Sequence, residues 1–479
     1  MQSPVRALHI GLLCPGHSGH LNPTATLGNA LQERGHRVTL ISTPQPAALA
    51  AAERHSLSFE PIGIPEYESG ALQTNLTHEG RLRGLQAFRH TIRLFKREEQ
   101  LILRDLPSLL QRNEIDAICV DQLLPAAVDV CEVYGIPACI LCNALPLHLD
   151  ASIPPFITTW KPPRAQDGGR FGNALRRFRN RVANLGIVMV AAPLYLTINT
   201  YRRRNGLKKH GLSTAQNVGN LQLTQIPSFL DFERTSLPSH FYYSQPWHVT
   251  QRDSNIDFPW EKLDGRPILY VSLGTVQNRL QRLYSVLLDA CPESHQLVMA
   301  LGRKNASLPS NYQLPKNAVV VDYAPQTRLL PLADCVVTHA GMNTALEAIR
   351  SAKPMVCIPL CNDQPGVAAR LEYHGACRLI KSGRATPGTV KKAILLVLED
   401  PSYRRNSEKL SWRIQNECIT LEQTAELVEE GLSRPINSPF ELGDRVARRP
   451  FAASTLATNT SSTLGSREYG FNVTMVVQD

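Results

Sequence analysis

Two loops in the first third of the chain carry side chains that can move a proton. His17 and His20 follow the apolar run 8–14, and Asp121 follows the apolar run 115–120. The imidazole of histidine titrates near neutral pH, and a carboxylate bound to its second nitrogen orients the ring and stabilises its charged form. This combination is typical of a general base that takes a proton from a hydroxyl group. The spacing alone does not decide between His17 and His20.

A polar segment in the last third of the chain has the features of an anion-binding site. The apolar run 335–337 is followed by His339 and Gly341, and a predicted helix begins near Asn343. Free backbone N–H groups and the helix dipole favour a phosphate at such a helix start. Asn343 and Thr344 add side-chain donors, and a charged His339 would add a stronger hydrogen bond.

Other polar side chains follow the neighbouring apolar runs. Glu347 lies one helical turn after Asn343, where its carboxylate can accept hydrogen bonds from the hydroxyls of a ribose. Asp363 and Gln364 follow the run 355–358. Because open α/β sheets bind ligands at the carboxyl ends of their strands, we expect both side chains beside the same ligand.

The apolar run 267–273 ends in a short motif that also suits a phosphate. Gly274 allows close approach of the backbone, and the hydroxyl of Thr275 can donate to a distal phosphate. The sequence contains no Asp-x-Asp motif, which argues against a diphosphate bound through a metal ion.

Residues 321–364 resemble the donor-binding signature of the UDP-dependent glycosyltransferases. The resemblance implies that Tyr323 stacks on the uracil ring, that Gln326 contacts the uridine, and that Glu347 binds the ribose. Plant members of the family have Trp where this chain has Tyr323. The implied donor is therefore a UDP-sugar, and no further cofactor and no metal ion are expected.

The resemblance also assigns the other end of the donor. His339, Asn343 and Thr344 are expected to bind the diphosphate. Asp363 and Gln364 are expected to bind the hydroxyls of the sugar. The complete set implied for UDP-sugar binding is Thr275, Tyr323, Gln326, His339, Gly341, Asn343, Thr344, Glu347, Asp363 and Gln364.

The same resemblance decides between the two histidines. Members of the family have a Gly-His-x-x-Pro motif after the first strand, which residues 19–23 match, and its histidine is the base. Their aspartate partner lies where this chain has Asp121. The resemblance therefore implies that His20 takes the proton of an acceptor hydroxyl, which attacks the anomeric carbon opposite the diphosphate and inverts it. His17 is then a loop residue or part of the acceptor site.

The pattern of apolar runs predicts an α/β fold with two doubly wound parallel sheets, as in Rossmann-like domains. A chain of 479 residues exceeds one ordinary core, and the resemblance implies the GT-B arrangement, in which two such domains face a cleft. Strands and helices alternate from residue 8, the pattern lapses at about 154–259, and it resumes at 267. We predict an acceptor-binding domain at 1–244, a linker at 245–265, a UDP-sugar-binding domain at 266–400, helices at 401–432 that cross back to the first domain, and a disordered tail at 433–479.

Local signals mark the first helix and the cellular compartment. Asn22 as N-cap, Pro23 at the first position and Gly35 after the end predict a helix between them. The eleven cysteines lie mostly in apolar runs, which is typical of reduced core residues in a cytoplasmic protein. Cys139 and Cys142 form a C-x-x-C motif inside a strand, where a redox or metal role is not expected.

The net charge of +10 is concentrated in one region. Residues 161–210 contain twelve Lys and Arg and one Asp, and they flank the apolar run 185–198. One interpretation is a buried helix with solvated basic ends, and the other is peripheral contact with an anionic membrane near the acceptor site. The run, interrupted by Pro193, is too short to span a bilayer. Charge without a motif predicts no nucleic-acid partner.

A narrower likeness concerns the acceptor. Residues 121–125, 142–147 and 258–263 resemble bacterial and cyanobacterial members related to the zeaxanthin glucosyltransferases, and macrolide-type members look similar. This implies transfer of a hexose, with glucose expected, to a carotenoid, another terpenoid, a polyketide or a phenolic. The apolar side chains at 145–160 line an acceptor pocket or belong to the ordinary core.

Two other classes of protein share parts of this pattern. A nucleotide-sugar epimerase can have the same two-domain fold, but it does not need His20 paired with Asp121. A non-catalytic scaffold at a membrane would use the basic region 161–210 and leave Glu347, Asp363 and Gln364 without a role.

Overall fold

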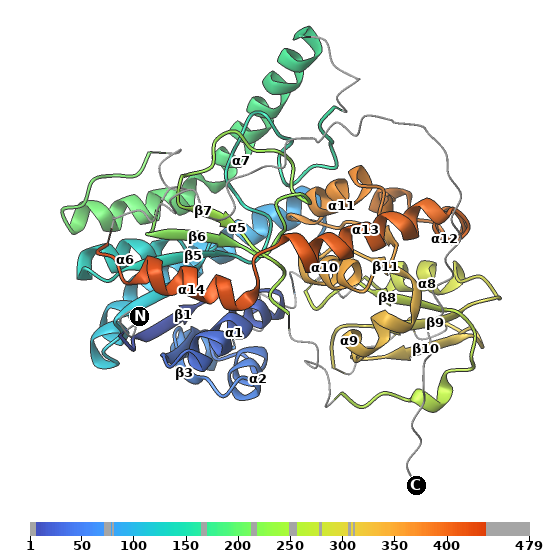
Figure 1. Cartoon of the computed structure of the whole chain (residues 1–479), viewed down its shortest axis with the longest axis horizontal. Helices are drawn as coiled ribbons and strands as arrows, with labels where there is room; N and C mark the ends of the chain where they lie inside the picture. The colour runs from blue at the N-terminus through green and yellow to red at the C-terminus, as the bar shows by residue number, and fades with distance from the viewer. Residues whose placement is uncertain are drawn as a thin grey trace, which may run out of the picture. The chain divides into compact units, whose positions relative to one another are not determined.

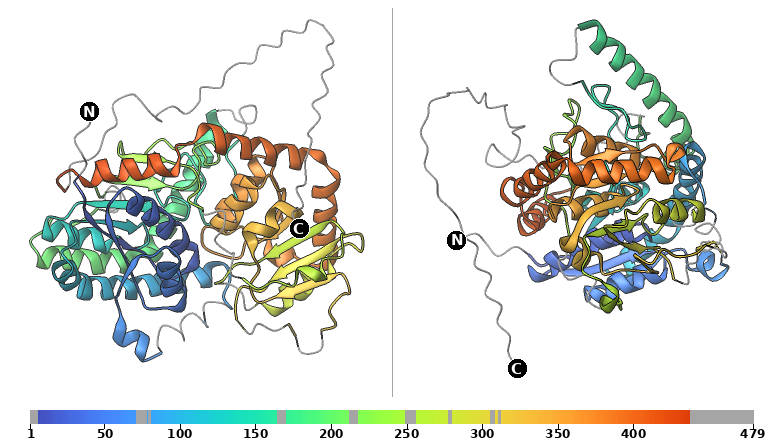
Figure 2. Two further views of the ribbon diagram at one scale, coloured as in Figure 1. Left: turned by 60° about the horizontal axis from the view of Figure 1, so that its bottom comes forward. Right: turned by 90° about the vertical axis from the view of Figure 1, so that its right-hand side faces the viewer.

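The computed structural model describes residues 6–70, 78, 81–163, 170–211, 218–248, 256–276, 280–304, 308–309 and 312–436. Residues 1–447 form one compact unit, within which the two sheets lie in separate lobes (Figure 1 and Figure 2). The disorder predicted for the tail concerns residues that lie, from 437 onward, outside the described part of the chain.

The first sheet is parallel and has seven strands in the order β3-β2-β1-β4-β5-β6-β7. The order reverses between β1 and β4, which are direct neighbours with Leu13 opposite Val120. Loops that follow these two strands leave the sheet at the same edge, where doubly wound folds bind ligands. The strands are β1 His9–Leu13, β2 Arg37–Ser42, β3 Ser58–Pro61, β4 Ala117–Asp121, β5 Ala138–Cys142, β6 Leu221–Thr224 and β7 Phe241–Tyr243.

The second sheet is also parallel and has the order β10-β9-β8-β11-β12-β13. Its order reverses between β8 and β11, where Ser272 is opposite Thr338. The expectation of two doubly wound parallel sheets is therefore confirmed. The strands are β8 Ile268–Ser272, β9 Gln296–Ala300, β10 Ala318–Val321, β11 Ala333–Thr338, β12 Met355–Cys357 and β13 Cys377–Leu379.

Helices cover both faces of each sheet, because both faces are apolar. In β4, Ala117 and Cys119 pack into one hydrophobic cluster, whereas Ile118 and Val120 pack into the cluster on the other face. The helices are α1 Ser18–Glu33, α2 Pro46–Arg54, α3 Ile64–Glu68, α5 Gly84–Arg112, α6 Ala126–Tyr134, α7 Arg170–Arg204, α8 Gln281–Asp289, α9 Gln326–Leu329, α10 Met342–Arg350, α11 Gln364–Tyr373, α12 Pro387–Glu399, α13 Pro401–Glu417 and α14 Leu421–Leu432.

The last helix returns to the first sheet. α13 packs against α10 and α12, whereas α14 packs against α1, β5 and β6 (Figure 1). Glu429 on α14 binds Arg34 Nε at 2.6 Å and His36 Nε2 at 2.9 Å. The final helix is therefore tied to the first lobe.

Two local predictions were wrong. The stretch 154–259, expected to be irregular and partly helical, contains the long helix α7 but also the strands β6 and β7 of the first sheet, which were not expected. α1 begins at Ser18 with His17 as N-cap, so Pro23 lies inside the helix rather than at its first position. Proline has no N–H, which leaves the carbonyl of Gly19, four residues earlier, without a helical partner. Asn343 Nδ2 donates to that carbonyl instead, at 2.8 Å.

Candidate active site

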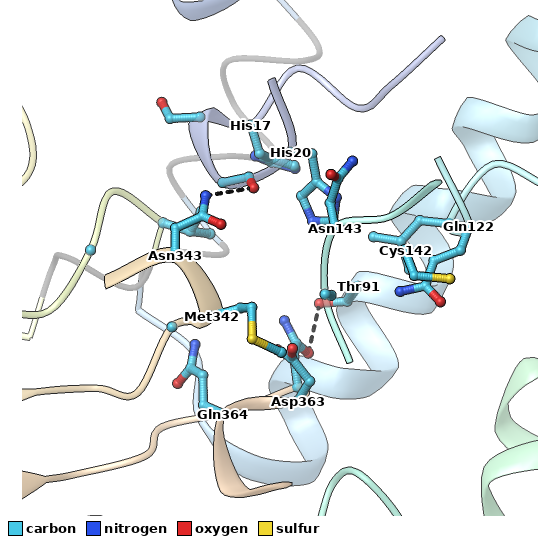
Figure 3. A pocket seen from close by; sticks show the side chains of 18 of the residues that line it. His17, His20, Thr91, Gln122, Cys142, Asn143, Met342, Asn343, Asp363 and Gln364 are labelled. Atoms are coloured by element: carbon cyan, nitrogen blue, oxygen red, sulfur yellow. Dashed lines mark hydrogen bonds between the residues drawn. The ribbon is translucent and has the colours of Figure 1, made fainter. Parts of the chain in front are cut away.

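His20 and Asp121 form a buried pair at the edge of the first sheet where β1 and β4 end. His20 Nδ1 lies 2.7 Å from Asp121 Oδ2, and the side chains are 16 % and 0 % exposed. Burial lowers the pKa of His20, but the charge of Asp121 and the hydrogen bond to it outweigh burial, so that the pKa is raised. Because Nδ1 is bound to Asp121, Nε2 is the nitrogen that can receive a proton from the cavity (Figure 3).

Asp121 is held by three donors. Its Oδ1 accepts from the backbone N–H of Leu123 at 2.9 Å, and its Oδ2 accepts from Asn143 Nδ2 at 2.7 Å as well as facing His20. Asn143 also donates to Thr24 Oγ1 at 2.9 Å. Sequence analysis missed Asn143, although its position directly after β5, beside β4, was a usable signal.

The donor side of the site is built around the ring of His339. A Cβ atom at Gly274 or at Gly341 would lie 2.6 Å from this ring, so only glycine leaves room for it at both positions. Gly274 also has a φ of +75°, which favours glycine. Burial lowers the pKa of His339 to about 4. The charged imidazole expected from the sequence is therefore disfavoured.

The residues predicted at the nucleoside form a chain of hydrogen bonds. Gln326 Nε2 donates to Glu347 Oε2 at 2.5 Å, and Gln326 Oε1 accepts from the hydroxyl of Tyr270 at 3.0 Å. Gln326 lines the cavity, but Glu347 is 5 % exposed and lies behind it. Tyr323 lines the cavity and is 45 % exposed, so one face of its ring is open for stacking. The direct ribose contact of Glu347 stays a prediction.

The residues predicted at the sugar lie at the start of α11 and also serve their own loop. Gln364 Oε1 accepts from the backbone N–H groups of Leu360 at 2.9 Å and Cys361 at 3.1 Å. Asp363 Oδ2 accepts from the backbone N–H of Leu145 at 3.2 Å, and burial raises the pKa of Asp363. Both residues line the cavity (Figure 3).

One cavity of about 550 Å³ joins the two groups. His17, His20, Thr275, Gly341, Asn343 and Thr344 are among its lining residues. Its apolar wall comes mainly from α5 and α7, which sequence analysis did not place at the site. Those apolar side chains are Phe88, Ile92 and Phe95 of α5 and Ile187, Val188, Ala191, Leu194 and Tyr195 of α7, with Leu147 and Phe156 from the segment that follows β5.

Two parallel sheets, a histidine–aspartate pair and a helix start suited to a phosphate surround one cavity, an arrangement typical of a glycosyltransferase. Residues 12–419 match the family described as "UDP-glucoronosyl and UDP-glucosyl transferase". The chain belongs to this family and is a UDP-glycosyltransferase. The GT-B fold implied by the sequence is confirmed by solved structures of glycosyltransferases.

Relatives with named activities cover most of the chain. A zeaxanthin glucosyltransferase of Pantoea ananas is 28 % identical over 77 % of this chain and 83 % of that protein. An oleandomycin glycosyltransferase of Streptomyces antibioticus is 24 % identical over 93 % and 97 %. The crystal structure of the glycotransferase of kitacinnamycin has a TM-score of 0.69 at 20 % identity, over 89 % of this chain and 99 % of that chain.

Proposed function

We propose that this enzyme inverts the anomeric centre as it moves glucose from UDP-glucose to a hydroxyl of a small lipophilic acceptor. The observation that carries the proposal is the single cavity onto which both His20 and the group around His339 open. A base and a phosphate site that face the same cavity are what direct displacement of a diphosphate requires.

In the proposed reaction, side chains of this protein accept the proton and stabilise the leaving group. His20 Nε2 takes the proton of the acceptor hydroxyl as its oxygen bonds to the anomeric carbon, and Asp121 stabilises the imidazolium. The bond from the anomeric carbon to the phosphate oxygen breaks at the same time, and its electron pair leaves with UDP. The start of α10, Thr275 and the neutral His339 stabilise the departing diphosphate, so we propose that no metal ion and no further cofactor take part.

The acceptor is proposed from the apolar wall of the cavity. Aromatic and aliphatic side chains of α5 and α7 line one part of the cavity, and this apolar wall suits a carotenoid, another terpenoid, a polyketide or a phenolic. The named relatives act on a carotenoid and a macrolide.

All eleven cysteines are free, and Cys139 and Cys142 lie in clusters on opposite faces of the first sheet. Free thiols favour a reducing compartment, so a cytoplasmic location belongs to the proposal.

The test is product analysis with the purified full chain. It is incubated with UDP-glucose and a pool of lipophilic hydroxyl compounds, and the products are identified by mass spectrometry. A mass gain of one hexose, lost in His20→Ala, supports the proposal. UDP-glucose incubated alone is the control for the other enzyme class, because conversion to an epimer without acceptor would show an epimerase instead.

A further inference from the structure

Helix α7 presents an apolar stripe to the outside of the molecule. Its first half projects away from both sheets (Figure 1 and Figure 2). The stripe residues recur every three or four positions and then after seven, which places them on one side of the helix. They are between 55 % and 69 % exposed, and they are Leu175, Phe178, Val182, Leu185, Met189 and Leu196.

The opposite face of α7 belongs to the protein. α7 packs against α5 and α6, and its buried Ile187, Ala191 and Leu194 line the cavity. The helix is therefore the wall that separates the acceptor cavity from the exposed stripe. The interpretation of a buried helix with solvated ends accounts for only one of its two faces.

The ends of α7 carry exposed positive charge. The helix has no acidic residue. The exposed basic side chains are Arg177 and Arg181, among the first residues of the stripe, and Arg203, Arg204, Lys208 and Lys209, which follow its last residue. Arg202, which the sequence placed in this basic cluster, is instead buried in ion pairs with Asp129 and Glu132. Its role is to fix the end of α7 to α6.

Charge decides between the surfaces that can cover the stripe. A second copy of the chain would bring two sets of basic side chains together, whereas anionic lipid headgroups complement them. α7 is a continuous helix of 35 residues. By length and composition alone it could cross a bilayer, because an 18-residue window within residues 172–204 has a mean hydropathy of 1.6, and 22 % of that window is buried. The expectation that the run 185–198, interrupted by Pro193, is too short to span a bilayer stays a prediction. A spanning helix would nonetheless have to leave the cavity wall and the Arg202 ion pairs.

We propose that the α7 stripe docks on the surface of an anionic bilayer and lies in the plane of the headgroups. An acceptor dissolved in the membrane then meets the cavity at the helix that forms its wall. The docking itself goes beyond the proposed function. Only the delivery of the acceptor from the membrane rests on the proposed function.

Co-sedimentation of the full chain with lipid vesicles tests the docking without donor or acceptor. Vesicles of phosphatidylcholine with phosphatidylserine are compared with pure phosphatidylcholine, at low and at high salt. We expect binding to the anionic vesicles at low salt, and a loss of about tenfold in the partition coefficient at high salt or without phosphatidylserine. Absence of binding at low salt, or equal binding to neutral vesicles, overturns the proposal.

Two matched variants locate the surface. Phe178→Gln, Leu185→Gln and Met189→Gln together remove the centre of the stripe, and we expect a loss of binding of at least about tenfold. The control on α12 combines Leu396→Gln, Lys391→Gln and Lys392→Gln, which are also exposed, and should bind like the wild type. Equal loss in both variants overturns the assignment to α7.

Analytical ultracentrifugation without lipid gives a second, independent measurement. A monomer for the wild type and for the stripe variant supports the bilayer as the occupant. A wild-type dimer that the stripe variant dissociates would show that a second copy covers the stripe, and would overturn the proposal. Circular dichroism of each variant confirms that it is folded.

Discussion

Asn343 at the start of α10 donates a hydrogen bond of 2.8 Å to the carbonyl of Gly19, the residue before the proposed base His20. The carbonyl is free because Pro23 cannot bond to it within α1. The other end of the Asn343 amide, Oδ1, accepts from Gln225 Nε2 at 3.0 Å. The first turn of α1, which holds His20, and the start of α10, where the diphosphate is proposed to bind, are therefore directly joined.

Asn343→Ala tests whether this side chain is mainly a bridge or mainly a phosphate ligand. A neutral hydrogen bond contributes about 1 kcal/mol, so we expect a loss of about fivefold in kcat. If the bridge is its main role, the Kd of UDP by calorimetry changes less than kcat. Pro23→Ala supplies an N–H that can bond to the carbonyl of Gly19 within α1. This change should weaken the hydrogen bond between Asn343 and Gly19, and it should lower kcat as Asn343→Ala does. A large loss of UDP affinity with unchanged kcat would instead make Asn343 a phosphate ligand.

His20→Ala is expected to remove the base and leave the donor site intact. Loss of a general base lowers the rate by about 10²–10⁴-fold, which single-turnover kinetics measures. UDP affinity should stay at the wild-type value, since Thr275 and His339 lie on the donor side. His17→Ala is the matched control, because His17 lines the cavity but lies at the N-cap of α1. A greater loss of rate in His17→Ala would move the role of base to His17.

The acid limb of the pH profile should report His20. The base must be neutral to take a proton, so kcat falls as the pH drops through the raised pKa of His20, above its ordinary 6.5. Asp121→Asn removes the charge that raises this pKa and should shift the limb to lower pH while lowering kcat. A limb that does not move would mean that another group titrates.

The titration of His20 should also change the free energy of unfolding, in the opposite sense to kcat: the contribution of His20 to stability is greatest at low pH. A histidine whose pKa is raised on folding stabilises the protein fully below its unfolded value of 6.5. This contribution is lost as the pH rises through the raised pKa. Urea unfolding of wild type and His20→Gln across this range measures the difference, which should shrink toward alkaline pH.

The positions of His20 and Asp121 could be predicted from the sequence, because parallel sheets bind their ligands at the carboxyl ends of the strands. Asp121 ends β4 and His20 follows β1, so the order of these two strands in the sheet is enough to bring them together. The strands β6 and β7 were missed, since they have only four and three residues and the first contains the buried Gln222.

The directions of the polar side chains could not be predicted in the same way. The partner of Asn343 is Gly19, more than 300 residues earlier, and it is free only because of Pro23. The sequence also did not show that one face of α7 lines the cavity while the other face is exposed. Apolar residues on both of its faces are typical of a buried helix, and only the fold shows which face the cavity takes.

Metal removal tests the electrostatics of the leaving group. We expect excess EDTA to leave kcat unchanged, because the start of α10, Thr275 and His339 are proposed to stabilise the diphosphate. Added Mg²⁺ should likewise have no effect on the EDTA-treated enzyme. Loss of activity with EDTA that Mg²⁺ restores would contradict this arrangement.

Substitutions of Glu347 and Gln364 should distinguish the residues that bind the nucleotide from those that bind the sugar. Glu347 holds Gln326 through a hydrogen bond of 2.5 Å, so Glu347→Ala frees the amide at the nucleoside end of the cavity. We expect UDP and UDP-glucose to lose affinity together, by about tenfold, which corresponds to one hydrogen bond to a charged group. Calorimetry with UDP alone and with UDP-glucose measures both.

Gln364→Ala is the matched change at the sugar end. Its Oε1 holds the backbone of Leu360 and Cys361, beside Asp363, so its loss should loosen the loop that meets the sugar. Turnover of UDP-glucose is expected to fall by about tenfold or more while the Kd of UDP stays within about twofold. Gln364→Glu keeps the accepting oxygen for the two N–H groups and should recover part of the turnover. An equal loss of UDP affinity in Glu347→Ala and Gln364→Ala would place both residues at the nucleotide and leave the sugar without its predicted ligands.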